Sequence, residues 1–257
     1  MRIRRVITIT GLAISIMILA VGLVSASEPV NPVRSNLSIL ARTSNGVKVA
    51  ILDSGSNIAY KEGISLIDAT VKDYHGHGTL MASIVKEVYP QAQLYIVKVV
   101  GRDGLILNEE AVILGLEWAI SRNVDVINMS LRLKDSERLH GIIQKAHQQG
   151  IVIVAAAGNN STRMGLPRLC AQERGLLTAE TAIDLTAVAY PAKYSEVIAV
   201  GALNQYGKVY NESAQSEEVD LYFRGYRGKR AGTSIASAYV AGTIARVISE
   251  KTLRQAP

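Results

Sequence analysis

A serine in a stretch of small residues is the first candidate for chemistry in this sequence. Gly232 opens the stretch, and an apolar, helix-forming run follows to about Ile248. The run has almost no polar face before Arg246, which predicts a buried central helix. Ser234, in the first turn, would lie among unpaired backbone N–H groups at the positive end of the helix dipole, where negative charge on a bound oxygen is stabilised. This segment alone leaves Ser234 as either a plain N-terminal cap or a nucleophile.

Two other stretches supply an acid and an imidazole. The mainly apolar run VKVAILDSG ends in Asp53, and the run HGHGTLMAS carries a glycine-flanked His77 into a predicted helix. Asp53 would stand at the carboxyl end of a buried strand, where open α/β sheets place their ligands. The order Asp53, His77, Ser234 resembles the subtilisin-like serine peptidase family, whose chain order is Asp, His, Ser. The resemblance covers roughly residues 47–249 and rests on three separate motifs in the correct order.

The resemblance implies a catalytic triad. Ser234 would attack the peptide carbonyl, His77 would take its proton and return it to the leaving amine, and Asp53 would fix the imidazole tautomer. Taken alone, Asp53 could simply be a turn former before Gly55. His75 is a rival base, but the family motif His-Gly-Thr matches His77. A metal site on the two histidines lacks a third ligand at metal spacing, so no metal and no other cofactor is expected.

An amide donor and a substrate-binding strand complete the expected site. The family's oxyanion donor is the Asn that ends a strand, which corresponds here to Asn159, and the backbone N–H of Ser234 would be the second donor. The alternative for Asn159 is a left-handed residue that closes the strand. Residues 124–131 resemble the family strand that pairs with extended substrate. The substrate-binding residues expected on this basis are Ser130, Leu131, Arg132, Ala157 and Gly158.

Some features depart from the family pattern. Residues 132–134 (Arg-Leu-Lys) replace the usual glycines and would narrow or charge the pocket for the residue before the scissile bond. The connection from the His77 helix to the strand at Leu94 is too short for the family's calcium loop, so no calcium site is expected there. Residues 161–189 form a long insertion, expected to act as a lid or exosite. It contains Cys170, the single cysteine, which excludes an internal disulfide.

These side chains need a scaffold of alternating strands and helices. Strands are predicted at 47–52, 94–100, 124–131, 151–157 and 196–203, and helices at 77–88, 109–121, 136–150 and 232–248. Asn108 and Ser136 are the predicted caps of two of these helices. The spacing indicates a parallel sheet with right-handed crossovers. An irregular polar region is expected from residue 204 to Arg230. The fold class is therefore α/β, a three-layer subtilisin-like fold with a central, mostly parallel sheet flanked by helices.

The domain plan begins with an export signal. The chain has 257 residues, 48% of them hydrophobic, which suits one α/β domain at 47–250 with a tail at 251–257. Residues 1–26 combine arginines, an apolar run and small residues, as in a secretory signal peptide; the alternative is an uncleaved membrane anchor. A short connector, 27–46, has no room for the family's pro-domain. We expect a secreted or cell-envelope protein that contacts the membrane only if its N-terminal segment is not cleaved.

The net charge of the chain does not indicate nucleic-acid binding. The net charge is +6 and the pI about 9.4, and part of the excess lies in the leader. For the basic run 224–230, a solvated loop is favoured over a nucleic-acid contact, and a self-cleavage target is a further alternative. We expect a monomer whose partners are protein or peptide substrates. The expected function is an exported serine endopeptidase that acts through an acyl-enzyme. The alternatives are a catalytically silent peptide-binding module on the same fold, and a transpeptidase or ligase.

Overall fold

The computed structural model describes residues 46–159 and 187–255. A seven-stranded sheet is the centre of this part, and each pair of neighbouring strands is parallel. In order across the sheet, the strands are β2 (Glu62–Ser65), β3 (Gln93–Lys98), β1 (Lys48–Asp53), β4 (Val126–Met129), β5 (Val152–Ala156), β6 (Val197–Leu203) and β7 (Leu221–Arg224). The predicted parallel sheet is confirmed.

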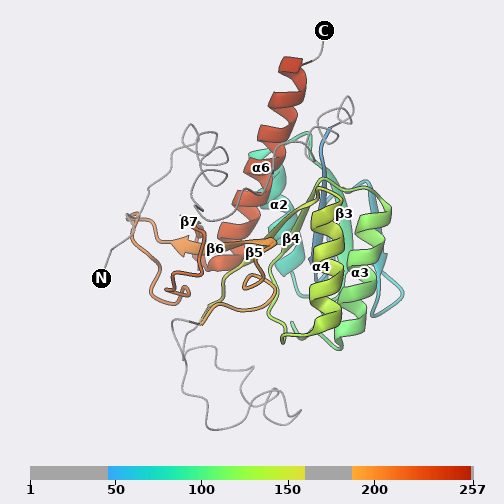
Figure 1. Cartoon of the computed structure of the whole chain (residues 1–257), viewed down its shortest axis with the longest axis horizontal. Coiled ribbons are helices and arrows are strands. Elements are labelled where there is room, and N and C mark those ends of the chain that lie inside the picture. Colours follow the sequence, from blue (N-terminus) through green and yellow to red (C-terminus); the bar gives the residue numbers. More distant parts are fainter. Residues whose placement is uncertain (1–45, 160–186, 256–257) are drawn as a thin grey trace, which may run out of the picture.

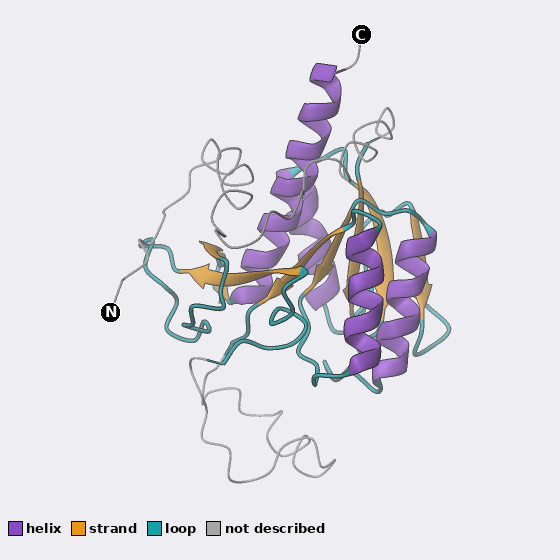
Figure 2. Cartoon of the chain, viewed as in Figure 1, coloured by secondary structure: helices purple, strands orange, loops and turns teal. Residues whose placement is uncertain are grey.

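Helices cover both faces of the sheet, which makes three layers (Figures 1 and 2). One face carries α3 (Glu109–Ser121) and α4 (Glu137–Gln148), and the other carries α2 (His77–Val88) and α6 (Thr233–Gln255). The side chains of β1 show why both faces need cover. Ala50 and Leu52 belong to the first core, and Val49 and Ile51 belong to the second, because successive strand residues point to opposite faces. The three-layer α/β fold expected from the sequence is therefore present.

The helix ends follow local sequence rules. Asn108 Oδ1 accepts a hydrogen bond from Ala111 N at 2.8 Å, and Ser136 Oγ accepts one from Leu139 N at 3.1 Å, so both predicted caps are confirmed. Gly150 ends α4 with a φ of 77°, a conformation that suits glycine. The face of α4 predicted to be apolar is buried: Leu139, Ile142, Ile143 and Ala146.

The strand prediction for residues 124–131 is too long, since β4 covers only Val126–Met129. Val124 N donates to Ala119 O at 3.4 Å, which ties this residue to the end of α3 instead of the sheet. Ser130, beyond β4, turns its hydroxyl towards α6.

The expected irregular region up to Arg230 is also wrong in part. It contains β7 and a hairpin of β8 (Tyr226–Arg227) and β9 (Arg230–Ala231). The sequence did not predict β2 either. These strands are only two to four residues long and none of them is fully buried, so they are too short to show the periodicity or the long apolar run that marks a buried strand. α6 continues past residue 248 to Gln255, so the expected tail at 251–257 begins as helix.

Several predictions fall on residues outside the described ranges. These are the signal segment 1–26, nearly all of the connector 27–46, Cys170, and the insertion 161–189 up to residue 186. Among the helices of the described ranges, none combines the length and the apolar character needed to span a membrane.

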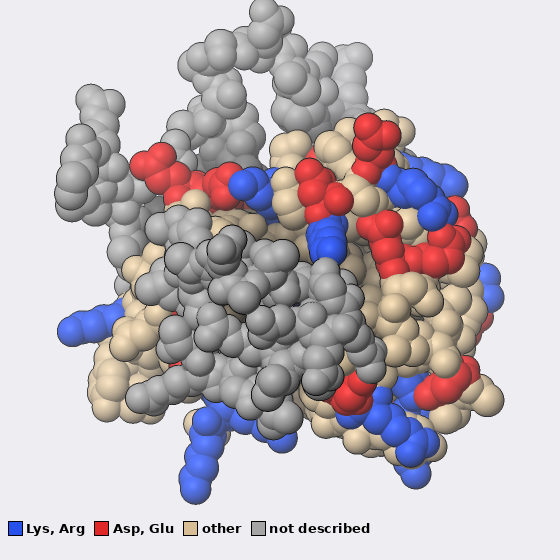
Figure 3. All heavy atoms as spheres, turned by 90° about the horizontal axis from the view of Figure 1, so that it is seen from below, with Lys and Arg blue, Asp and Glu red and all other residues tan. Residues whose placement is uncertain are grey.

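Charged side chains do not form a uniform surface. On the face of the molecule drawn in Figure 3, acidic and basic side chains are interspersed among the described residues. Nucleic-acid binding calls for basic side chains gathered in a patch or stripe. On this face the described residues form no such patch, and the absence of nucleic-acid binding stays a prediction.

Candidate active site

The candidate residues gather at one edge of the sheet. Asp53 is the last residue of β1, Ser130 directly follows β4, and Asn159 lies three residues beyond β5. Because the strands are parallel, their carboxyl ends share this edge, where α/β proteins commonly bind ligands. His77 is the first residue of α2, and Ser234 is the second residue of α6.

Asp53 and His77 form a hydrogen-bonded pair. Nδ1 of His77 lies 2.9 Å from both carboxylate oxygens of Asp53, and Ser54 N donates to Asp53 Oδ1 at 2.8 Å. Asp53 is 1% exposed, whereas the side chain of His77 is 31% exposed. Since an ionised carboxylate only accepts hydrogen bonds, Nδ1 carries the proton and Nε2 is left as the basic nitrogen.

The pKa of His77 is raised above its ordinary value of 6.5. The negative charge of Asp53 is the main cause, burial of the ring opposes it, and the hydrogen bond to Asp53 adds to it. Asp73 raises the pKa further, and Arg230 lowers it. His77 is thus a stronger base than a free histidine, as a proton acceptor for an alcohol requires.

His75, the rival base, lies elsewhere. A Cβ added to Gly104 would come within 2.8 Å of Nε2 of His75, so this ring packs on the turn at residues 101–104. Its centroid is 6.2 Å from that of His77. His77, and not His75, is therefore the partner of Asp53. Within the described ranges, no three or more His, Cys, Asp or Glu residues group as metal ligands would.

Asp73 holds the turn that carries His77, a role that the sequence did not reveal. Its Oδ1 accepts from Ser54 Oγ at 2.9 Å and from Gly76 N at 2.7 Å, and its Oδ2 accepts from Thr79 N at 2.8 Å and Thr79 Oγ1 at 2.6 Å. Burial would raise the pKa of Asp73, but the hydrogen bonds, led by those from Thr79 and Gly76, bring it below its ordinary value. Asp73 thereby caps the start of α2 from outside the helix.

Asn159 caps α6, the helix that carries Ser234. Its Oδ1 accepts from Thr233 N at 2.9 Å and from Thr233 Oγ1 at 3.1 Å. With the amide oxygen facing Thr233, Nδ2 remains as a donor at the edge of the site. Gly232 has a φ of 151°, and a Cβ there would lie 2.9 Å from Asn159 Nδ2. Glycine is therefore required before Thr233, and the cap that Ser234 could have provided comes from Asn159.

A buried hydroxyl network supports the Ser234 turn. Ser237 Oγ donates to Ser234 O at 3.0 Å and lies 3.0 Å from Ser130 Oγ, which accepts from Asn128 Nδ2 at 3.2 Å. Asn128 is fully buried on β4, and its Oδ1 has no hydrogen-bond partner among the described residues. The sequence did not predict Ser237 or Asn128, because nothing in the spacing separates them from residues of an ordinary helix or strand.

The same network brings the His77 and Ser234 turns close together. Ser130 Oγ lies 3.4 Å from both Met81 Sδ and Ser234 O. Met81 is four residues after His77 and so lies on the same face of α2. No hydrogen bond joins His77 directly to Ser234 in the described chain, and the hydroxyl of Ser234 makes none there. The structure brings Asp53 to His77 and Asn159 to the Ser234 turn, with Ser130 between the two groups.

The other expected substrate-binding residues line the ends of β4 and β5. Leu131 is buried and Arg132 is exposed. The backbone of Ala157 is engaged, since its N donates to Val200 O and its O accepts from Ala189 N. Gly158 N donates to Thr233 Oγ1 at 3.3 Å. Substrate contacts by these residues stay a prediction.

Comparison with known proteins identifies the family of this chain. The subtilase (Peptidase S8) family model matches residues 44–254, so the chain belongs to the subtilase family. It is similar to the minor extracellular protease Epr of Bacillus subtilis (strain 168), with 30% identity over 229 residues, 79% of this chain and 32% of that protein. It is also 32% identical to the subtilisin of Bacillus pumilus over 241 residues, 81% of this chain and 78% of that protein.

A solved structure shows a similar fold. It is described as a cold adapted subtilisin-like serine proteinase, has 25% identity and a TM-score of 0.61, and aligns with 80% of this chain and 76% of its own. The chain spans only about a third of Epr and 57% of several subtilisins that it matches. By their names, the relatives include both an extracellular and an intracellular protease.

Proposed function

We propose that this chain is a serine endopeptidase that hydrolyses protein or peptide substrates through an acyl-enzyme on Ser234. The observation that carries the proposal is the hydrogen-bonded pair of Asp53 and His77, in which the charge of Asp53 raises the pKa of the imidazole. Membership of the subtilase family supports it.

The roles follow from the atoms available. Nε2 of His77 accepts the proton of Ser234 Oγ as that oxygen attacks the carbonyl carbon, and then gives the proton to the departing amine. Asp53 holds the imidazole in the required tautomer and stabilises the imidazolium. Asn159 Nδ2 and the backbone N–H of Ser234 donate to the oxyanion at the positive end of the α6 dipole. Water then releases the acyl group by the same steps.

A fluorophosphonate probe tests the nucleophile. The parent is expected to be labelled and the Ser234→Ala variant is not, while Ser237→Ala, altered on the same helix, keeps the label at a lower rate. Lack of labelling in folded parent protein, or equal labelling of Ser234→Ala, would exclude this mechanism. Mass spectrometry of the products distinguishes hydrolysis from transfer to an amine.

We also propose that the protein is exported. The support is the leader at residues 1–26, with its arginines, apolar run and small residues. Sequencing the N-terminus of protein recovered from outside the cytoplasm tests this, and we expect a start near Ser27. A start at Met1 contradicts cleavage, and recovery of all the protein from the cytoplasm contradicts export.

A further inference from the structure

The β8–β9 hairpin is attached directly to the nucleophile turn. Its register pairs Tyr226 with Ala231 and Arg227 with Arg230. At its base, Gly232 N donates to Gly225 O at 2.8 Å, and Gly232 itself packs against the amide of Asn159. The position of the hairpin is therefore set by the same contacts that set the start of α6.

The hairpin and the residues beside it carry two kinds of cation. Arg224 lies over the ring of Tyr239, with 4.7 Å from its guanidinium carbon to the ring centroid, and Arg227 pairs with Glu87 at 3.2 Å. Lys229 and Arg230 are exposed, and neither forms a salt bridge within the described chain. The first two stabilise the fold, whereas the second two present positive charge to solvent.

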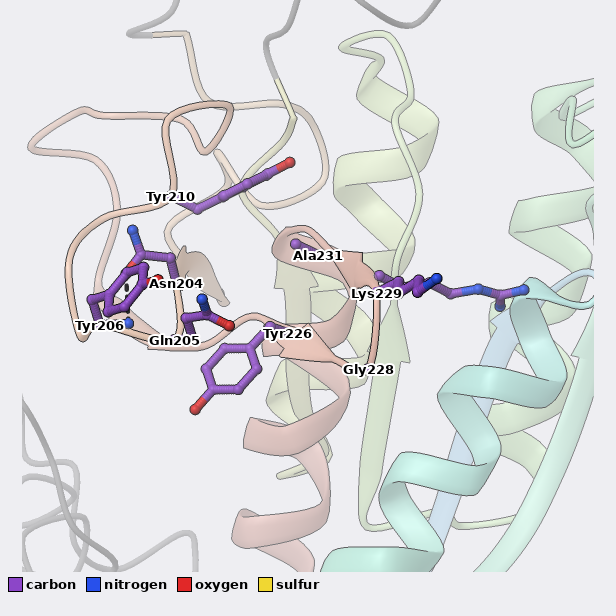
Figure 4. A pocket seen from close by; sticks show the side chains of 9 residues that line it. Asn204, Gln205, Tyr206, Tyr210, Tyr226, Gly228, Lys229 and Ala231 are labelled. Carbon is purple, nitrogen blue, oxygen red and sulfur yellow. Dashed lines mark hydrogen bonds between the residues drawn. The ribbon is translucent and has the colours of Figure 1, made fainter.

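An open hollow of about 220 Å³ adjoins the hairpin. Figure 4 shows a loop with Asn204, Gln205 and Tyr206 on one side and the hairpin with Tyr226 and Gly228 on the other. The full lining is Asn204, Gln205, Tyr206, Tyr210, Tyr226, Gly228, Lys229, Arg230 and Ala231, which includes amides, phenols and two cations but no carboxylate. Figure 4 shows that Lys229 extends from the hairpin away from Asn204, Gln205 and Tyr206, so the hollow itself presents mainly amides and phenols and the positive charge lies on the other side of the hairpin.

The hairpin brings a cation near the imidazole of His77. Arg230 is close enough to His77 for its charge to act on the imidazole, and it precedes Ser234 by only four residues. In acyl transfer the protonated imidazole gives its proton to the departing amine, so the substrate beyond the scissile bond must pass beside His77. The cation near His77 therefore lies near the residues that leave.

We propose that Arg230 and Lys229 select substrates with acidic residues on the leaving-group side of the scissile bond. The inference rests on the proposed function, since it defines a leaving-group side. It assigns a role to the basic run 224–230, for which the sequence favours only a solvated loop. Complementary charge adds selectivity and faster association more than affinity.

Peptide cleavage tests the selection. A diverse peptide library, digested by the parent, first gives a cleaved sequence. Matched peptides are then made with Asp, Gln or Lys at the first three positions after the cut. We expect kcat/KM to be about 3- to 10-fold higher for Asp than for Lys peptides, as two partly exposed ion pairs allow. In about 0.5 M salt the ratio falls, because exposed charges are screened.

Three variants identify the source of the preference. The double variant K229Q/R230Q is expected to lose it, and K229E/R230E to reverse it in favour of Lys peptides. R227Q is the matched control on the same hairpin, because the guanidinium of Arg227 is already paired with Glu87, and it should keep the preference. An unchanged preference in K229E/R230E, or no preference in the parent, overturns the proposal.

Binding to the Ser234→Ala variant gives the same answer without turnover. Fluorescence anisotropy should show tighter binding of the Asp peptides than of the Lys peptides, and K229E/R230E added to Ser234→Ala should invert that order. Failure of fluorophosphonate labelling would refute the proposed function alone, whereas labelling and cleavage without charge preference would refute only the acidic-substrate selection. Equal binding of Asp and Lys peptides counts against that selection in either case.

Discussion

The helices that carry His77 and Ser234 begin in different electrostatic surroundings. The first turn of α2, which carries His77, rests on two buried carboxylates, Asp53 and Asp73, whose oxygens are taken up by hydrogen bonds. The first turn of α6, which carries Ser234, is held by the neutral Asn159 and by serine hydroxyls, with the cation Arg230 nearby. The same element, a helix start at a strand edge, is thus supported by anions in one case and by neutral groups in the other.

This difference matches the movement of charge in the proposed acyl transfer. Positive charge develops on the imidazole of His77, and buried anions stabilise it. Negative charge develops on the carbonyl oxygen beside Ser234, where a carboxylate would be repulsive and amide donors are favourable. Both supports are in place before substrate binds, so little reorganisation is needed during the reaction. Altering the charge at the start of α2 or of α6 should therefore change the rate or the pH dependence of catalysis, and the sign of the charge change should set the direction.

Placing a negative charge in the neutral surroundings of Ser234 should have the largest effect. Asn159→Asp keeps an oxygen that can accept from Thr233 N, but it removes the Nδ2 donor and adds negative charge beside the oxyanion. We expect kcat to fall by at least about 10²–10³-fold, the range that follows removal of one such Asn donor from a subtilisin. The melting temperature should stay near that of the parent, because Asp caps helices about as well as Asn.

The matched variant for this test is Asn159→Ala. It removes the cap and the donor together, so it should lose comparable activity and also about 1 kcal/mol of stability. Steady-state kinetics with thermal unfolding of both variants separates the two roles. An active Asn159→Asp enzyme would show that Asn159 acts only as a cap.

Removing an anion from the other side should have an intermediate effect. In Asp73→Asn, an amide N–H₂ would face the two donors of Thr79, or the other oxygen would lose its bonds to Ser54 and Gly76. We expect a loss of about 2–3 kcal/mol in the free energy of unfolding at pH 7. Because the folded pKa of Asp73 lies below its ordinary value, this contribution is present above the unfolded pKa and is lost as pH falls through the folded pKa. Urea unfolding from pH 7 to pH 3 measures the free energy of unfolding of the parent and the variant. The difference between the two should shrink as pH falls.

A pH profile distinguishes a positioning role of Asp73 from a merely structural one. The charge of Asp73 raises the pKa of His77, so its removal should shift the acid limb of kcat/KM to lower pH. The control is Asp68→Asn, which removes the partner of Lys98 on the preceding loop and should leave that limb in place. If the acid limb of kcat/KM does not move in Asp73→Asn, Asp73 only stabilises the fold.

The groups proposed to react could be picked out in the sequence, and most of the groups that support them could not. Asp53, His77 and Asn159 stand where elements begin or end, and periodicity locates such points well, so the motifs there can be interpreted. Asp73 acquires its role only when its loop folds back onto Ser54, 19 residues away in the chain. Nothing local in the sequence reports that contact.

The support of Ser234 escapes prediction for a different reason. Ser237 lies in a run of small helix-forming residues, and Asn128 lies in an apolar strand, so each looks like a minor exception within its element. Their hydroxyl and amide groups come together in one hydrogen-bond network only when α6 packs on β4. The β8–β9 hairpin resembles an irregular polar loop in sequence because its two-residue strands are too short to show alternation.

Removing the cation near Ser234 should have the smallest effect and tests the comparison most directly. Arg230 lowers the pKa of His77, opposing Asp53 and Asp73, so Arg230→Gln should move the acid limb of kcat/KM to higher pH. With an uncharged peptide the plateau at high pH should change little, because Arg230 contacts neither His77 nor Ser234 by a hydrogen bond. The shift should shrink as salt is added, since Arg230 is exposed. Arg227→Gln, across the hairpin and paired with Glu87, serves as the control that does not move the limb. If the acid limb moved to lower pH in Arg230→Gln, Arg230 would not oppose Asp53 and Asp73 in setting the pKa of His77. The electrostatic difference between the two helix starts would then not control the basicity of His77.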